Sequence, residues 1–259
     1  MKISDIITFS FRQELERIRR EEAGRAARGL IVYPDGRLAE RHLSWQSQFC
    51  RACVSTGYLT QQQMEHAARK YWLGLSRDGG VIFWQIDQLG QVADGKVMYY
   101  RPDCHRDHGH APTWVSNELK RFYQPPVDIA STRCLFGLHL LPQALQCGQA
   151  ACIAVVEAEK TAVILSELYP RQLWMATGGL NELSEGKLFP LRHQQVILFP
   201  DTDEDCQTYA RWYQVARRFR KLHGSRITVS TLLERQATRD QKRRKIDLVD
   251  FLFEDRRSQ

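Results

Sequence analysis

Residues 152–168 read CIAVVEAEKTAVILSEL, an unbroken apolar run followed directly by a helix-forming stretch. A short continuous apolar run is typical of a strand that is buried on both faces, as the strands of parallel sheets are. The stretch 159–168 favours a helix, and Pro170 lies just beyond its expected end. We therefore predict a buried strand over 152–156 followed by a helix that covers it.

The same alternation of strand and helix continues downstream. We predict further strands over 172–176, 195–199 and 226–229, separated by helices over 182–188 and 205–222. Gly224 lies just past the longer helix, where a glycine commonly ends a helix. Strands that alternate with helices indicate a parallel sheet with covering helices, which defines an α/β domain.

Upstream of this domain the chain has a different character. Residues 81–87 and 97–100 favour two strands joined by a turn over 88–91, which predicts a β-hairpin. Residues 61–70 favour a helix with Thr60 as its N-cap, and residues 11–29 favour a solvated helix.

We predict four regions along the chain. They are a helical N-terminal region over 1–78, a hairpin subdomain with a Pro125-Pro126 linker over 79–150, the α/β domain over 151–235, and a charged C-terminal tail over 236–259.

The composition limits the class of protein. Hydrophobic residues make up 43% of the chain, which is enough for a packed core, and the net charge of +7 favours an anionic partner such as nucleic acid. A soluble basic protein without such a partner has the same composition. No apolar run reaches the roughly 18 residues that a membrane span needs. With seven cysteines and a polar N-terminus, we expect a reduced, cytoplasmic protein.

Acidic residues follow two of the predicted strands. Glu157 comes directly after the first strand, Asp201 comes just after the third, and Asp203 lies two residues further on. The carboxyl ends of parallel strands meet at one edge of a sheet, where crowded carboxylates repel one another until a cation binds. Oxygen ligands suit Mg²⁺, which predicts a site for phosphoryl or nucleotidyl transfer. The alternative is that Asp201 caps the helix after it.

These acidic segments resemble the motifs of a known family. The segment 155–162, VVEAEKTA, resembles the first motif of toprim domains, although Ala158 stands where that motif usually has glycine. The segment 198–203, LFPDTD, resembles the second motif, a strand that ends in Asp-x-Asp. A glycine turn at 177–179 occupies the position where toprim proteins often carry one.

The resemblance extends on both sides of these motifs. Residues 83–92 resemble the hairpin that precedes toprim in bacterial primase cores, and residues 114–116 and 135–137 fall at further primase positions. The run 83–253 is similar to a toprim-containing family of unknown function encoded on bacterial mobile elements. In that family the segments 232–235 and 247–250 also recur, whereas the second Asp of Asp-x-Asp is often lost. Asp203 is retained here.

The resemblance implies a toprim domain, a Rossmann-like α/β fold with a parallel sheet, preceded by an α+β region with a β-hairpin. It implies that Glu157 acts as general base or acid and that Asp201 and Asp203, with Glu157, hold Mg²⁺ or Mn²⁺. Lys160 is expected either to meet a phosphate or to be an exposed helix lysine.

The implied function is a primase-like step on DNA, in replication or transfer of a mobile element. The implied partners are DNA, nucleotides, and a replicative helicase or other replication proteins. Two alternatives remain: a toprim nuclease that cleaves phosphodiesters, and a nucleic-acid-binding accessory protein with a silent site.

Basic and aromatic residues supply the candidates for nucleic-acid binding. Arg217, Arg220 and Lys221 share one helix face by their spacing, and a solvated surface is the competing interpretation. Trp84 is a candidate for stacking on bases, with core packing as the alternative. The candidates for this role are Arg217, Arg220, Lys221, Lys96 and Trp84.

Cys50 and Cys53 form a lone Cys-x-x-Cys pair. A zinc site needs further ligands, and the nearest lie in the loop 104–110, which contains Cys104 and three histidines. The apolar surroundings of the pair favour two buried thiols instead, so zinc is not expected.

Overall fold

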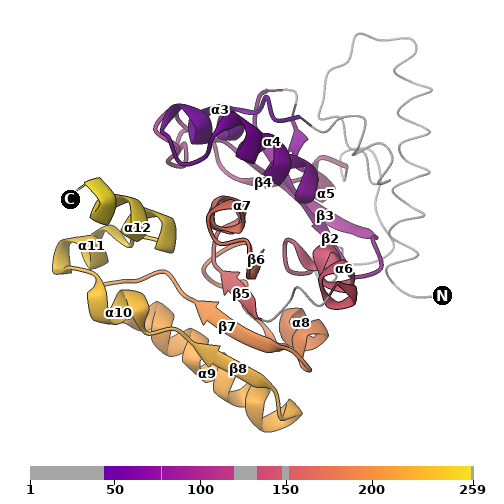
Figure 1. The fold of residues 1–259 in the computed structure, drawn as a ribbon, viewed down its shortest axis with the longest axis vertical. Helices are drawn as coiled ribbons and strands as arrows, with labels where there is room; N and C mark the ends of the chain where they lie inside the picture. Colours follow the sequence, from indigo (N-terminus) through magenta and orange to yellow (C-terminus); the bar gives the residue numbers. More distant parts are fainter. Residues whose placement is uncertain (1–43, 77, 120–132, 148–151, 258–259) are drawn as a thin grey trace. The chain divides into compact units, whose positions relative to one another are not determined.

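The computed structural model describes residues 44–257 except 77, 120–132 and 148–151 (Figure 1). The chain divides into two units, Met1–Cys134 and Leu135–Gln259. The predicted helix over 11–29 and the Pro125-Pro126 linker lie outside the described residues.

The first unit contains a four-stranded antiparallel sheet in the order β1-β2-β3-β4. Its strands are β1 (Gly74–Leu75), β2 (Val81–Ile86), β3 (Val92–Met98) and β4 (Thr113–Trp114). The predicted hairpin is confirmed as β2 and β3, which pair in antiparallel register. The second strand starts at Val92 rather than at the predicted residue 97.

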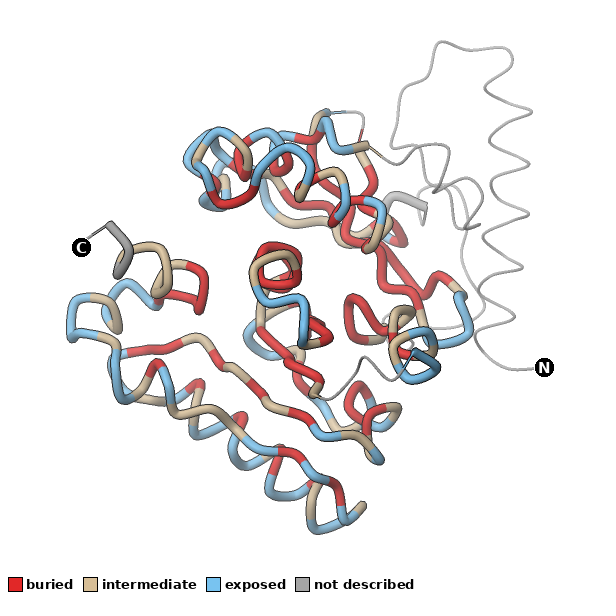
Figure 2. The backbone as a smooth tube through the Cα atoms, viewed as in Figure 1, coloured by how far each residue is buried: buried red, intermediate tan, exposed pale blue. Residues whose placement is uncertain are grey.

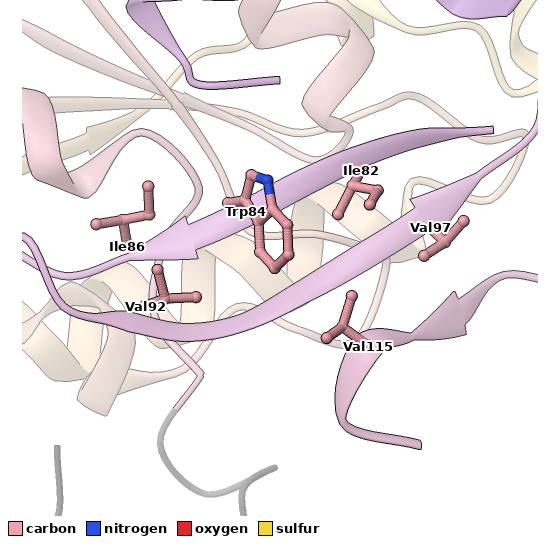
Figure 3. Packing of buried hydrophobic residues seen from close by; sticks show 6 residues of the cluster. All are labelled: Ile82, Trp84, Ile86, Val92, Val97 and Val115. Atoms are coloured by element: carbon pink, nitrogen blue, oxygen red, sulfur yellow. The ribbon is translucent and has the colours of Figure 1, made fainter. Parts of the chain in front are cut away.

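Packing around Trp84 explains the longer strand. The ring of Trp84 lies against Gly95 so closely that a Cβ at Gly95 would come within 2.7 Å of the ring. Gly95 therefore serves this packing although glycine weakens strands in general. Figure 3 shows Trp84 among the buried side chains of the hairpin and of Val115, with which it forms one apolar cluster.

Helices precede and follow the hairpin in this unit: α3 (Gln48–Ser55), α4 (Gln61–Lys70) and α5 (Val115–Leu119). The predicted α4 is confirmed, and Thr60 and Gln63 form a reciprocal capping box at its start. Phe49 of α3 packs against Phe83 and Tyr100, with ring centroids 5.5 Å and 5.0 Å away. These contacts bury α3 against β2.

The second unit contains a four-stranded parallel sheet in the order β6-β5-β7-β8, which confirms the predicted α/β character. Its strands are β5 (Ile153–Val156), β6 (Leu173–Ala176), β7 (Gln195–Phe199) and β8 (Arg226–Val229). Every residue of β5 and β6 is buried, as their continuous apolar sequences indicate.

The helices of this unit begin with η2 (Leu138–Leu140) and α6 (Leu141–Gln146). They continue with α7 (Glu159–Leu168), α8 (Glu185–Leu188), η3 (Phe189–Leu191), α9 (Gln207–His223), α10 (Leu232–Gln236), α11 (Arg239–Arg244) and α12 (Leu248–Arg257). The predicted α7 is confirmed at both ends. The helix α8 is shorter than predicted because Ser184 caps it, accepting from the backbone N–H of Lys187.

The helices α7 and α9 differ in how deeply they are buried. Eight consecutive residues of α7, from Glu159 to Ser166, are buried. In α9 buried and exposed positions alternate along the helix (Figure 2), and its inward face carries Trp212, Ala216 and Phe219. In the part of the chain that the structure describes, no helix combines the length and apolarity required to cross a membrane.

Candidate functional site

Glu157 and Asp201 lie at the carboxyl ends of adjacent strands. β5 and β7 pair in parallel up to Val156 and Phe199; Glu157 is the next residue after β5, and Asp201 follows β7 by two residues. The two carboxylates interact electrostatically. Burial first, and then the charge of Glu157, raise the pKa of Asp201 well above its usual range.

Asp203 caps α9. Its carboxylate accepts hydrogen bonds from the backbone N–H groups of Asp205 (3.1 Å), Gln207 (2.8 Å) and Thr208 (2.7 Å). Burial acts to raise the pKa of Asp203, but these hydrogen bonds outweigh it and hold the pKa below its usual value. Helix capping, the alternative considered for Asp201, is thus the role that the structure gives to its neighbour Asp203.

A second acidic residue holds the loop that carries Asp201. Glu234 of α10 accepts hydrogen bonds from Thr202 Oγ1 at 3.0 Å and from Cys206 Sγ at 2.9 Å. Glu234 therefore holds the loop between β7 and α9 at two positions, Thr202 and Cys206, and the first of these is the residue after Asp201.

The C-terminal segment brings two further carboxylates to the site. Lys160 Nζ lies 3.1 Å from Asp247 Oδ2 and 3.6 Å from Asp250 Oδ1, and Thr161 Oγ1 donates to Asp247 Oδ2 at 2.7 Å. α12 packs against α7 (Figure 1), which holds this segment in place. The segment 236–259, predicted as a charged tail, thus contributes side chains to the acidic cluster.

Asp247 and Asp250 were not predicted as site residues. The signal available was the recurrence of the segment 247–250 in the similar mobile-element family. In the structure Asp247 precedes the first residue of α12, and its Oδ1 accepts from the backbone N–H of Asp250 at 2.8 Å. Helix capping therefore orients Asp247 so that its other carboxylate oxygen faces Lys160.

The charges around Asp201 are mostly of its own sign. Besides Glu157, the carboxylates of Asp247 and Asp250 act to raise its pKa, and Lys160 is the cation that opposes them. Lys160 also holds the pKa of Asp247 below its usual value, together with hydrogen bonds, against the effect of burial. Lys160 is only 7% exposed, so its ammonium group forms a buried ion pair rather than an exposed one.

The donor set suits a hydrated magnesium ion. Within the described residues no group of three or more His, Cys, Asp and Glu side chains is arranged to hold a metal ion. Mg²⁺, however, usually keeps several waters and takes one or two protein carboxylates together with substrate phosphates. Glu157 and Asp201 are such a pair, and the crowded negative charge around Asp201 favours a cation there.

Three cysteines of the first unit, Cys50, Cys53 and Cys104, are buried. Cys50 and Cys53 are buried as predicted, and Cys53 Sγ lies 3.4 Å from Cys104 Sγ. Burial raises the pKa of Cys50 to about 11. The Cys50 thiol is therefore protonated at neutral pH, which is typical of an inert buried cysteine.

The predicted nucleic-acid-binding residues fall into three environments. Arg217 and Lys221 are exposed on α9 and Arg220 is half-buried; Lys96 is half-buried on β3, opposite Phe83 and Trp114. Trp84 is 3% exposed and belongs to the core of the hairpin, so core packing, the alternative considered for it, is what the structure shows.

The chain thus contains two units. One has an antiparallel sheet built on a β-hairpin, and the other has a parallel sheet with carboxylates at the C-terminal ends of its strands. The chain belongs to the family described as "Domain of unknown function (DUF6371)", whose model matches residues 47–202. A search of the curated proteins gave no match.

Among solved structures, the chain is similar to primase cores. For the RNA polymerase domain of Mycobacterium tuberculosis primase DnaG the identity is 15%, the TM-score is 0.45, and 85% of this chain and 84% of that chain are covered. For the E. coli primase catalytic core the identity is 16%, the TM-score is 0.48, and 86% of this chain and 82% of that chain are covered. For a DnaG primase catalytic domain bound to ssDNA the identity is 16%, the TM-score is 0.48, and 85% of this chain and 82% of that chain are covered.

Proposed function

We propose that this protein is a primase-like toprim protein that carries out Mg²⁺-dependent nucleotidyl transfer on DNA. The observation that carries the proposal is the pair Glu157 and Asp201 at the ends of adjacent parallel strands, where their charges interact. The resemblance of residues 155–162 and 198–203 to the toprim motifs supports it independently. The proposed setting is replication or transfer of a mobile element, with DNA, nucleotides and replication proteins such as a helicase as partners.

Glu157 and Asp201 have different roles in this proposal. Glu157 is half-buried, and in this proposal its carboxylate takes the proton of an attacking hydroxyl group. Asp201 is crowded by the negative charges of Glu157, Asp247 and Asp250 and is the proposed anchor for the cation. A bound Mg²⁺ or Mn²⁺ supplies positive charge that neutralises phosphate oxygens and orients them for in-line attack.

Lys160 and Asp203 act as positioning residues in this proposal. Lys160 holds Asp247 and Asp250 at the site through its buried ion pairs. Asp203 fixes the N-terminus of α9, and with it the loop that carries Asp201. Neither side chain needs to touch the substrate for its loss to disturb the geometry of Glu157 and Asp201.

Primer synthesis from labelled ribonucleotides on a single-stranded DNA template tests the proposal. With Mg²⁺ present, Glu157→Gln and Asp201→Asn should each lower the rate by about 100-fold or more, as expected for loss of acid–base or charge stabilisation. Asp205→Asn is the matched control, because Asp205 is an exposed carboxylate on the same loop. Its rate should equal that of the wild type.

Three other outcomes overturn the proposal. Synthesis that survives Glu157→Gln removes the site from the reaction. Cleavage of plasmid DNA with Mg²⁺ alone, without primer synthesis, identifies a nuclease. Tight, salt-sensitive DNA binding without either activity, unchanged by Glu157→Gln, identifies an accessory protein with a silent site.

A further inference from the structure

The helix α9 carries positive charge on its outward face and no acidic residue. Its 17 residues include five arginines and lysines, of which Arg211, Arg217, Arg218 and Lys221 are exposed. Arg218 is paired with Glu185 at 2.6 Å. Within the described residues, Arg217 and Lys221 form no ion pair, so their charge is available to an anionic partner.

An aromatic pair extends this basic face along the helix. Tyr209 and Tyr213 stack with ring centroids 6.1 Å apart and planes 21° apart, and Tyr213 is 43% exposed. Tyr209, Tyr213, Arg217 and Lys221 follow one another at intervals of four residues, so they form one stripe that winds along α9. At 1.5 Å per residue the stripe is about 18 Å long.

The stripe starts near the acidic rim of the sheet. Asp203 caps the N-terminus of α9, and Asp201 lies two residues before it. Tyr209 is in the first turn of the helix, whereas Lys221 is in the last. The aromatic half of the stripe is therefore the half nearer to Asp201, and α9 then runs alongside β8 (Figure 1).

We propose that the stripe Tyr209, Tyr213, Arg217 and Lys221 binds single-stranded nucleic acid. Bases stack on the tyrosine pair, and phosphates of the same strand contact Arg217 and Lys221. Exposed aromatic rings beside unpaired cations are the combination that single-strand binding proteins use, because every base has a face that can stack and every nucleotide has a charge. The role of the stripe in leading a strand to the site rests on the proposed function.

Helix electrostatics alone do not explain the stripe. Basic residues in the last turn interact favourably with the helix dipole, which accounts for Arg220 and Lys221. That effect is confined to the last turn and does not explain the stack of half-buried Tyr209 on exposed Tyr213 in the first two turns. A duplex is also a poorer fit, since its paired bases cannot stack on Tyr213.

Fluorescence anisotropy with two probes tests the proposal on the 259-residue chain. The probes are an oligothymidylate of about 12 nucleotides, within the usual span of single-strand sites, and an abasic strand of the same length. Tyr213→Ala should weaken oligothymidylate binding by about fivefold or more and leave abasic-strand binding unchanged. Arg217→Gln with Lys221→Gln should weaken binding of both probes and reduce the slope of log affinity against log salt by about 1.4.

Matched controls come from the other edge of the sheet. Tyr169 is 38% exposed and Arg171 is exposed, and both lie in the turn before β6, the edge strand farthest from β8. Tyr169→Ala and Arg171→Gln should bind both probes like the wild type. The proposal is overturned if these controls lose as much affinity as the stripe variants, or if Tyr213→Ala binds oligothymidylate normally.

The binding assay separates this proposal from the proposed function, because it needs neither nucleotides nor turnover. Normal binding by the stripe variants, with primer synthesis lost in Glu157→Gln, overturns the stripe and leaves the function standing. Binding lost in the stripe variants, in a protein that makes no primers, supports the stripe and overturns the function.

Discussion

Asp94 in the hairpin unit and Asp201 in the α/β unit are both aspartates whose pKa burial raises. Asp94 is fully buried but well partnered: it accepts hydrogen bonds from Ser116 Oγ at 2.8 Å and from Arg133 Nε at 3.0 Å. Arg133 is itself held over the ring of Trp114, 3.5 Å from the centroid. Around Asp201 the neighbouring charges are mainly carboxylates.

The two aspartates differ in the charges and hydrogen-bond donors that surround them. An aspartate whose donors and cation are supplied by the fold stabilises that fold, whereas one that is crowded by like charge leaves a need for a cation. Asp94 is thus a structural residue, and the surroundings of Asp201 are those expected of a binding site.

Asp94→Ala should produce the largest loss of stability. It leaves the Arg133 guanidinium, whose side chain is 14% exposed, without its carboxylate. Removing one partner of a buried ion pair typically costs about 3–5 kcal/mol in the free energy of unfolding, measurable by urea denaturation. Asp103→Ala is the control: it breaks the exposed Arg101–Asp103 pair and should cost about 1 kcal/mol or less. Equal losses would show that Asp94 has no special structural role.

Lys160→Met should destabilise the α/β unit by about 3 kcal/mol, because Asp247 and Asp250 lose their buried cation. Mg²⁺ should restore part of this stability, since an added cation takes up the same negative charge, and EDTA should remove the gain. Lys221→Met, at an exposed position of α9, should change stability by no more than about 0.5 kcal/mol. A Lys160→Met protein as stable as the wild type would contradict the assigned charge balance.

Asp201→Asn should stabilise the protein at neutral pH, on the order of 1 kcal/mol, while lowering the rate of the proposed primer synthesis. The folded-state pKa of Asp201 lies above 3.8, so the native state binds more protons than the unfolded chain. The contribution of Asp201 is therefore favourable at low pH and is lost as pH rises through that pKa. The advantage of Asp201→Asn in thermal unfolding should shrink as pH falls toward 3.8. An advantage that grows on acidification would refute this sign.

Asp203→Ala should have an effect of similar size but opposite sign, a loss of about 1 kcal/mol, as expected for removal of a helix cap. Its carboxylate has the opposite shift, a lowered pKa, so its stabilisation is present above 3.8 and is lost as pH falls through the lower folded-state pKa. Mg²⁺ should raise the melting temperature of Asp203→Ala as much as that of the wild type. A variant that no longer responds to Mg²⁺ would make Asp203 a ligand rather than a cap.

Local sequence was sufficient for the elements whose signals are local. Residues 153–156 and 195–199 are short, mainly apolar runs. Pro170 lies just past the end of α7, and Gly224 lies just past the end of α9. For these reasons α7, β7 and β8 lie where they were predicted. The start of β3 was missed because Asp94 and Gly95 are poor strand formers. Only the tertiary contact between Gly95 and Trp84 reveals why they belong to a strand.

The site was predictable only in part for the same reason. Glu157 and Asp201 follow predicted strands, so topology brings them together. Asp247 lies 86 residues from Thr161, its hydrogen-bond partner, and no periodic pattern encodes that pairing. The sequence of the Asp-x-Asp segment does not distinguish a second aspartate that binds metal from one that caps a helix. In the structure, Cys206 has a left-handed backbone with φ of 55°, and this turn brings the backbone amides at the start of α9 onto the Asp203 carboxylate.

The contact between Thr161 and Asp247 also has a consequence for the order of events during synthesis of the chain. Lys160 is synthesised before Asp247 and Asp250, the carboxylates with which it pairs. In a nascent chain that has already paired β5 with β7 but lacks these carboxylates, the ammonium group of Lys160 has to remain in water. α7 can be fully buried only after α12 has emerged. Shortening the chain before residue 246 should therefore leave a half-assembled α/β unit that chaperones and proteases recognise, although every strand of its sheet is present.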